Sequence, residues 1–185
     1  MTKPVLRGEI VDYQSYEDGR EAARAAILAE KAPRRVHVGE FLTFLFENHD
    51  TMRYQIQEMI RAERMVKEAD IVHEIETYNE VLGGPGELGA TLLIEIDSPE
   101  ERAVRLREWL DLPKALYARL ADGTKVRPTY DARQVGDGRV SSVQYLRFAL
   151  GGNVPVAIGS DHEALTAEAT LTAEQTKALA IDLSD

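Results

Sequence analysis

The sequence predicts an α+β fold, in which a largely antiparallel sheet packs with a long central helix and a C-terminal helix. Hairpins predominate in the second half of the chain, and no alternation of strand, helix and strand is sustained. A helical pattern at about residues 51–82 is long enough to be the central helix. These two observations favour an antiparallel sheet over a doubly wound fold.

The chain of 185 residues has the length of a single domain, which would span 1–185. We expect three parts within it. Residues 1–33 form an N-terminal helical segment, and residues 34–112 form a half with the order strand, helix, strand, helix. Residues 113–185 form a hairpin-rich half that ends in the C-terminal helix.

The first helix is predicted at residues 13–32, where charges of alternating sign surround an alanine-rich run. Pro33 ends this helix. The densest basic stretch, residues 31–35, contains that proline and is therefore expected to be an exposed linker. Residues 36–46 follow as one apolar strand, in which Gly39 indicates a bend or bulge.

A turn at residues 48–50 precedes the central helix, and Asp50 or Thr51 is its expected N-cap. The glycine-rich stretch 83–86 ends the helix. The pattern also allows a break near residues 67–70, which would give two helices in place of one.

The remaining elements follow from alternation and capping signals. Residues 88–96 predict a strand, and Ser98 caps a helix that has Pro99 at its first position and continues to about Leu112. The second half is predicted to contain strands at 125–134, 140–150 and 154–158, a hairpin turn at 136–138, and a helix at 173–183 capped by Thr172.

Composition excludes several functional classes. The chain has no cysteine, which excludes disulfides, a cysteine nucleophile and an iron–sulfur cluster with the usual ligands. Its net charge of −10 repels phosphate backbones, so we expect no nucleic-acid binding. No apolar run approaches the roughly 20 residues of a membrane span, and the N-terminus has no apolar core of a signal peptide. We therefore expect a cytoplasmic protein.

The central helix carries charges on the face that should be apolar. On an ideal helix, Glu63, Lys67, Asp70 and Glu74 lie near the centre of the apolar stripe. A break that shifts the helical phase, or ion pairs along the helix, would make these residues structural. A polar functional site would explain them equally, because buried carboxylates must be paired, protonated or bound to metal.

A metal site is one form of that functional hypothesis. Asp70 and His73 are spaced as i and i+3, as in the Glu-x-x-His motif of di-iron bundles, but such bundles need two motifs and this chain has one. His162 follows a strand end, a common position for ligating groups. The metal alternative is therefore a single transition metal, with candidate ligands Glu63, Asp70, His73 and His162.

Several segments resemble an uncharacterised bacterial domain-of-unknown-function family of about this length. The matching pieces include Arg34-Arg35-Val36-x-Val38-Gly39, and the specific part runs from Phe46 to Arg64, with Phe46-Glu47-Asn48-x-x-Thr51 and Gln55-Ile56-Gln57-Glu58-Met59-x-Arg61-x-Glu63-Arg64. Weaker similarities occur at Glu74 with Tyr78-Asn79, Ala90-Thr91-Leu92 through Glu95, Val143-Gln144-Tyr145-Leu146-Arg147-Phe148, and Gly159-Ser160-Asp161-His162.

The resemblance implies no established activity, but it implies a setting. Members of that family are often encoded beside rubrerythrin, a di-iron peroxide-scavenging protein, and beside a cysteine-rich iron–sulfur oxidoreductase. We therefore expect a non-catalytic accessory protein of a bacterial redox or oxidative-stress system. It would bind one of those two proteins as its partner and would hold no cofactor. The sequence leaves open whether it forms a homo-oligomer.

Two other hypotheses remain open at this point. The first is an enzyme that binds a metal or a small ligand in a pocket of carboxylate, arginine and histidine side chains. The second is structural, with Arg61 and Arg64 paired to Glu47, Glu58 and Glu95 so that strand and helix are held together. The candidate polar site consists of Glu47, Asn48, Gln55, Glu58, Arg61, Glu63, Arg64, Glu74, Tyr78, Asp161 and His162.

Overall fold

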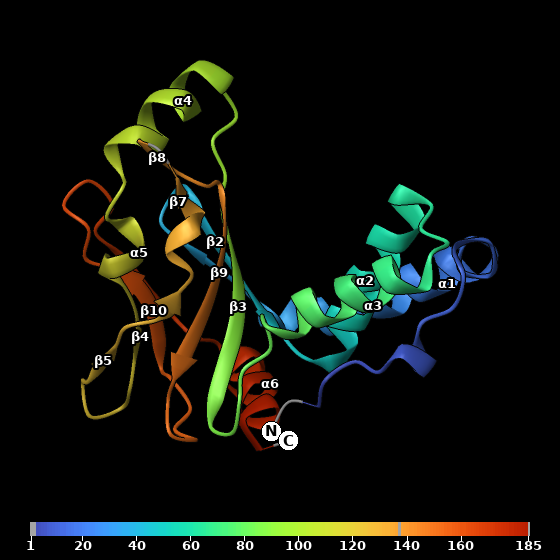
Figure 1. Cartoon of the computed structure of the whole chain (residues 1–185). Coiled ribbons are helices and arrows are strands. Elements are labelled where there is room, and N and C mark those ends of the chain that lie inside the picture. Colours follow the sequence, from blue (N-terminus) through green and yellow to red (C-terminus); the bar gives the residue numbers. More distant parts are fainter. Residues whose placement is uncertain (1–2, 137, 185) are drawn as a thin grey trace.

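A computed structural model describes residues 3–136 and 138–184 of the chain (Figure 1). The molecule has two parts. The body contains the β-sheets and the helices of the second half, and the arm contains the helices of residues 5–34 and 49–82. The α+β class, the antiparallel sheets and the C-terminal helix are as the sequence predicts. In the described part of the chain, no helix is long and apolar enough to cross a membrane.

The larger sheet of the body separates the arm from the body core. Its strands pair antiparallel throughout. Alternate residues of the strand at 143–149 are buried and exposed, so one face of the sheet packs on the core and the other faces outward. In spatial order the strands are β1 (Arg35–Val38), β2 (Leu42–Glu47), β3 (Glu87–Ile94), β9 (Val143–Ala149) and β6 (Thr129–Tyr130).

A second sheet closes the other side of the body core. It contains β11 (Ala167–Thr170), β10 (Ala157–Ser160), β4 (Leu116–Arg119) and β5 (Lys125–Val126) in that order, again antiparallel. A separate pair, β7 (Val135–Gly136) and β8 (Arg139–Val140), follows the 3-10 helix η3 (Ala132–Gln134). Asp137, in the predicted turn of this pair, lies outside the described residues.

Three helices complete the body: α4 (Pro99–Glu108), α5 (Leu112–Ala115) and α6 (Ala173–Ser184). The predicted caps of the longer two are confirmed, because Ser98 accepts from the Glu101 N–H and Thr172 from the Gln175 N–H. The core between the sheets is built from large apolar side chains that are almost fully buried, among them Phe44, Leu92, Trp109, Phe148 and Leu179.

The arm has a hydrophobic core of its own. Met52, Ile56 and Ile60 of its second helix pack with Ile71 and Ile75 of its third. Val5 and Ile10 of the N-terminal segment belong to the same hydrophobic cluster. The elements of the arm are η1 (Arg7–Glu9), α1 (Tyr13–Lys31), η2 (Ala32–Arg34), α2 (His49–Glu63) and α3 (Glu68–Asn79).

The central helix of the sequence prediction is two helices, because the chain breaks at Arg64. Arg64 adopts a left-handed backbone conformation with φ of 49°, and the Met65 N–H donates to the Ile60 carbonyl at 3.0 Å, which ends α2. The break shifts the helical phase, so Lys67 and Asp70 are exposed and do not lie in the apolar stripe. This is the break that the sequence pattern allowed, three residues earlier than expected.

Other boundaries also differ from the prediction. The strand expected at 36–46 is the hairpin of β1 and β2, because Gly39 has a φ of 63° and turns the chain. The strand expected at 125–134 is divided between the two sheets as β5 and β6, with Pro128 between them. The N-cap of α2 is Asn48, whose side chain accepts from the Thr51 N–H, and not Asp50 or Thr51.

Candidate functional site

The predicted polar-site residues do not converge on one place. The structure distributes them between the junction of arm and body, the contact of α1 with α2, the end of the arm, a cleft beside α3, and the end of β10. The contacts of the side chains at each location decide which groups remain available for a ligand or partner.

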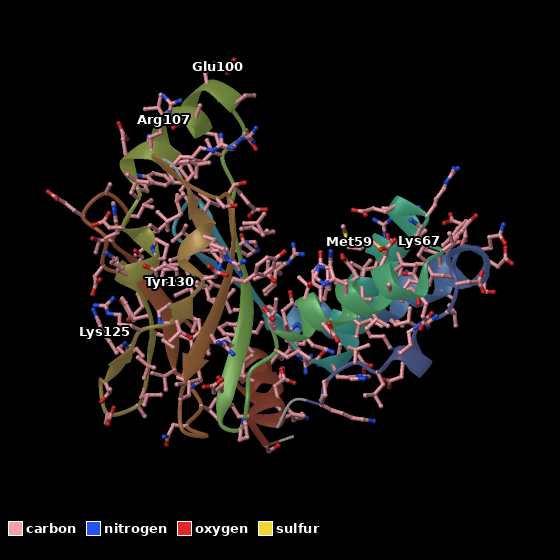
Figure 2. All side chains as sticks on the ribbon, viewed as in Figure 1. Met59, Lys67, Glu100, Arg107, Lys125 and Tyr130 are labelled. Carbon is pink, nitrogen blue, oxygen red and sulfur yellow. The ribbon has the colours of Figure 1, made fainter. Side chains whose placement is uncertain are left out.

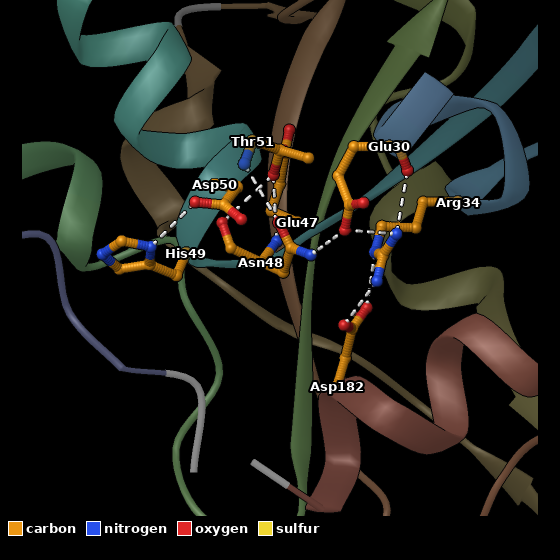
Figure 3. Close-up of polar contacts among 8 residues, drawn as sticks. All are labelled: Glu30, Arg34, Glu47, Asn48, His49, Asp50, Thr51 and Asp182. Carbon is orange, nitrogen blue, oxygen red and sulfur yellow. Dashed lines mark hydrogen bonds and ion pairs between the residues drawn. The ribbon is translucent and has the colours of Figure 1, made fainter. Parts of the chain in front are cut away.

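Asn48 belongs to a buried polar network at the junction of arm and body (Figure 3). Arg34 and Asp182 are 5% and 3% exposed and form a bidentate pair with both N–O distances at 2.8 Å. Arg34 also donates to the Glu30 carbonyl oxygen at 2.8 Å, and the Asn48 amide donates to the Glu30 carboxylate at 2.7 Å. The network joins α1, α2 and α6. The expectation that residues 31–35 form an exposed linker is therefore wrong at Arg34.

Glu47, the neighbouring residue, is also satisfied within the protein. Its carboxylate is 6% exposed and accepts from the Thr51 hydroxyl at 2.6 Å and from the Thr91 hydroxyl at 2.8 Å. Thr51 also completes a capping box with Asn48. The predicted pairing of Glu47 with an arginine is not observed, and this carboxylate ties β2, β3 and α2 together.

Glu58 and Arg61 lie in the contact between α2 and α1. The Glu58 carboxylate accepts from Arg20 at 2.8 and 3.0 Å, from the Tyr16 hydroxyl at 2.7 Å and from Arg61 at 3.3 Å. The Arg20 guanidinium holds the pKa of Glu58 well below its ordinary value, at about 2. The predicted pair of Arg61 with Glu58 is confirmed. These groups hold the two helices of the arm together.

Three of the candidate metal ligands, Glu63, Asp70 and His73, lie on the arm, and His162 lies in the body. Glu63 and Arg64 are exposed at the end of α2, Asp70 and His73 are exposed on α3, and Gln55 is half-buried on α2. Figure 2 shows the neighbouring Lys67 on the arm, away from Tyr130 on the body. Within the described ranges, no three histidine, aspartate or glutamate side chains are grouped so as to hold a metal ion.

Asp161 and His162 lie in the body at the end of β10. The Nε2 atom of His162 is 2.9 Å from an Asp111 carboxylate oxygen, and the His162 side chain is 9% exposed. The Asp161 carboxylate accepts from Arg127 at 2.6 Å. These two residues therefore form local pairs on the second sheet and share no site with the candidates on the arm.

Glu74 and Tyr78 line a cleft of about 730 Å³ between α3 and the outer face of the larger sheet. We call it the tyrosine cleft, because Tyr78, Tyr130 and Tyr145 are all among the residues that line it. Its wall on the sheet also contains Arg147. The complete lining is Glu74, Thr77, Tyr78, Glu80, Val81, Thr129, Tyr130, Asp131, Arg133, Gln134, Tyr145, Leu146 and Arg147.

Local sequence explains why the tyrosine cleft forms. Tyr145 and Arg147 alternate with buried neighbours along β9, so both point to the outer face of the sheet. The arm reaches this face because Gly89 on β3 admits the carbonyl oxygen of Val81, which lies only 1.9 Å from where a Cβ atom at residue 89 would be. Gly89 thus sets how closely the arm approaches the sheet.

The pKa values of the side chains in the tyrosine cleft favour ligand binding over acid–base catalysis. Partial burial, together with the neighbouring Tyr78, raises the pKa of Tyr145 to about 12. Tyr145 is therefore protonated at neutral pH and can donate a hydrogen bond, but it is a poor base or nucleophile. Burial also raises the pKa of Glu74, and Glu63 adds to that effect.

Sequence reasoning missed several residues of these clusters. Arg34 and Asp182 are separated by most of the chain, and only the fold brings them together. Tyr16 and Arg20 were assigned only to a helical segment. The sequence offers a usable signal for Tyr145, because alternation in the strand predicted at residues 140–150 puts every second side chain on the same face.

Comparison with known proteins identifies the family. The family described as a protein of unknown function, DUF3501, matches residues 4–183. The chain belongs to the DUF3501 family. A crystallised protein of unknown function from Burkholderia pseudomallei has the same fold as this DUF3501 chain, with a TM-score of 0.89 and 28% sequence identity. The similarity covers 99% of this chain and 100% of that one. No curated protein matches the DUF3501 chain.

Proposed function

We propose that this DUF3501 protein is a non-catalytic accessory protein that binds a protein partner through the tyrosine cleft. The observation that carries the proposal is the composition of the cleft, in which Tyr78, Tyr130 and Tyr145 stand together with Arg133 and Arg147. Tyrosine and arginine dominate the binding energy of protein interfaces, because each combines a large apolar area with hydrogen-bond donors.

The chemistry of the polar clusters supports a non-catalytic role. Glu47 and Glu58 accept hydrogen bonds from several donors, so neither is poised as a base. Tyr145 keeps its proton at neutral pH. A cleft that offers donors and aromatic surface is suited to recognition of a partner.

The partner is proposed to belong to a bacterial redox or oxidative-stress system in the cytoplasm. The support is the family resemblance, which implies a neighbourhood of rubrerythrin and a cysteine-rich iron–sulfur oxidoreductase. The chain contains no cysteine, so a cluster would be held by the partner and not by this protein.

The test is a titration of the purified protein with each of those two proteins, measured by isothermal calorimetry. We expect saturable binding to one of them and a weakening of about 30-fold or more in Tyr145→Ala, since a central interface tyrosine contributes about 2 kcal/mol or more. The matched control is Tyr54→Ala, which removes a tyrosine from a separate hollow between α1 and α2. Binding to neither protein, or equal weakening in both variants, would refute the proposal.

A second candidate is the binding of a small ligand in the tyrosine cleft. It is favoured by the volume of about 730 Å³, which lies within the range of small-molecule sites, and by the raised pKa of Glu74. Native mass spectrometry with elemental analysis, on protein purified without chelator or affinity metal, separates the two candidates. A stoichiometric added mass that is lost in Glu74→Ala supports this candidate, and a clean apo mass contradicts it.

A further inference from the structure

A second concave region lies between α4 and the β7–β8 pair, and it shares Arg133 and Gln134 with the tyrosine cleft. Figure 1 shows α4 above this pair, and α4 packs against β8. The cavity has a volume of about 540 Å³. We call it the arginine cavity, because Arg102 of α4, Arg133 of η3 and Arg139 of β8 all line it. The described residues in its lining are Pro99, Arg102, Ala103, Leu106, Arg133, Gln134, Gly136, Arg139, Ser141 and Ser142.

The charge of this cavity is opposite to that of the chain. The whole sequence has 32 acidic and 22 basic residues, yet none of the described residues that line the cavity carries a carboxylate. Asp131 offsets the charge of Arg133, but no carboxylate among the described lining residues offsets Arg102 or Arg139, and their charges favour an anion between them. The cavity is therefore a local positive site on an acidic protein.

The three arginines keep donors available for a ligand. Arg102 uses one nitrogen to donate to the Ile96 carbonyl oxygen at 3.1 Å. Arg133 pairs with Asp131, which lines the tyrosine cleft and not this cavity. The Arg139 side chain is exposed and makes no hydrogen bond or ion pair with any residue that the structure describes, while its backbone pairs with Gly136. Because each guanidinium carries five N–H donors, most donors remain free.

Hydrogen bonds connect the η3 side of the cavity to strand β9 of the larger sheet. The Gln134 side chain pairs with both the N–H and the carbonyl group of Tyr145, as a neighbouring strand would. The fully buried Gln144 donates to the Ser141 carbonyl oxygen at 2.7 Å. These contacts hold the backbone that carries Arg133 and Ser141, so less ordering is required when a ligand binds.

We propose that the arginine cavity binds the phosphate group of a small anionic ligand. Guanidinium groups match the oxygens of phosphate with paired N–H donors, and the hydroxyls of Ser141 and Ser142 can add further donors. The volume exceeds that of a single phosphate, which favours a phosphorylated organic molecule. The inference does not depend on a protein partner at the tyrosine cleft.

The experiment is an NMR titration of the full chain with inorganic phosphate and with glycerol 3-phosphate, at an ionic strength held constant with sodium chloride. We expect saturable shifts at the amides of Arg102, Arg139 and Ser141 in the wild type. Arg139→Gln should weaken binding about 10-fold or more, because it removes a charged bidentate donor. Tighter binding of glycerol 3-phosphate than of inorganic phosphate would show that the organic part contributes.

The matched control is Arg107→Gln, which removes the same charge from the exposed surface of α4, outside the cavity (Figure 2). It should leave the dissociation constant unchanged. Arg139→Gln should also retain the wild-type melting temperature, since the Arg139 side chain has no partner among the described residues to lose. The proposal is overturned if neither anion gives saturable shifts, or if Arg107→Gln weakens binding as much as Arg139→Gln does.

Discussion

Replacing Arg34 tests whether the buried network is what holds the arm to the body. Arg34 and Asp182 are almost wholly buried, and Arg34→Ala removes both of its bonds to Asp182 together with the bond to the Glu30 carbonyl oxygen. Removing one partner of a buried pair leaves an uncompensated charge and costs about 3–5 kcal/mol. For a domain of this size, that corresponds to a fall in melting temperature of about 6–20 °C.

The assay is urea unfolding followed by circular dichroism at several pH values. Burial already raises the pKa of Asp182, and loss of the Arg34 charge should raise it further. When the pKa of a carboxyl group is higher in the folded state than in the unfolded state, the free energy of unfolding falls as the pH rises through the interval between the two pKa values. The deficit of Arg34→Ala should therefore be largest at neutral pH and should shrink as Asp182 is protonated in acid.

Two further variants make the test specific. Arg35→Ala removes the adjacent exposed arginine and should change the free energy of unfolding by less than about 0.5 kcal/mol. Replacing the pair together, as Arg34→Met with Asp182→Leu, should recover most of the stability, because no buried charge remains. A loss below about 1 kcal/mol in Arg34→Ala, or a double variant as unstable as the single one, would refute the reasoning.

Three further predictions concern stability. The pKa of Glu58 falls to about 2 in the folded protein, so its carboxylate stabilises the arm at pH values above its ordinary pKa, and this contribution disappears as the pH falls toward 2. Glu58→Gln should lower the free energy of unfolding at neutral pH by about 2 kcal/mol, after allowance for solvent screening, and should flatten the acid limb of the stability–pH profile. An unchanged acid limb would contradict this prediction. Gly89→Ala should lower the free energy of unfolding, measured by chemical denaturation, by about 3 kcal/mol, because the new Cβ atom would meet the Val81 carbonyl oxygen. Gly136→Ala is the control, since a Cβ atom there would have no neighbour within 4 Å. Equal effects of the two substitutions would show that the arm moves freely from the sheet. Arg64→Gly should raise the melting temperature, because glycine adopts the left-handed conformation of residue 64 without the cost of about 1 kcal/mol that other residues incur. A lower melting temperature would show that contacts of the Arg64 side chain contribute more to stability than this backbone cost.

Much of the fold follows from local signals in the sequence. The alternation at residues 143–149 predicts a strand with one outward face, and that face carries Tyr145 in the structure. Ser98 and Thr172 predict the starts of two helices, because a hydroxyl that caps the first N–H groups acts within a few residues. Signals of this kind can be recognised without knowing what packs against the segment.

Other features depend on residues that are distant in the sequence. Nothing local distinguishes Arg34 from Arg35, yet one is buried and the other exposed, because α6 brings Asp182 to one of them. The charges that lay on the apolar stripe of an ideal helix become exposed once the chain breaks at Arg64.

The sequence by itself determined the fold class and the caps of α4 and α6, since these depend on periodicity and short-range hydrogen bonds. Only the tertiary structure decided which charges are paired, where the tyrosine cleft and the arginine cavity lie, and that the candidate polar residues are distributed over separate locations. Ion pairs and cavities arise where segments far apart in the chain meet. Their positions therefore depend on packing, which the pattern along a single segment does not record.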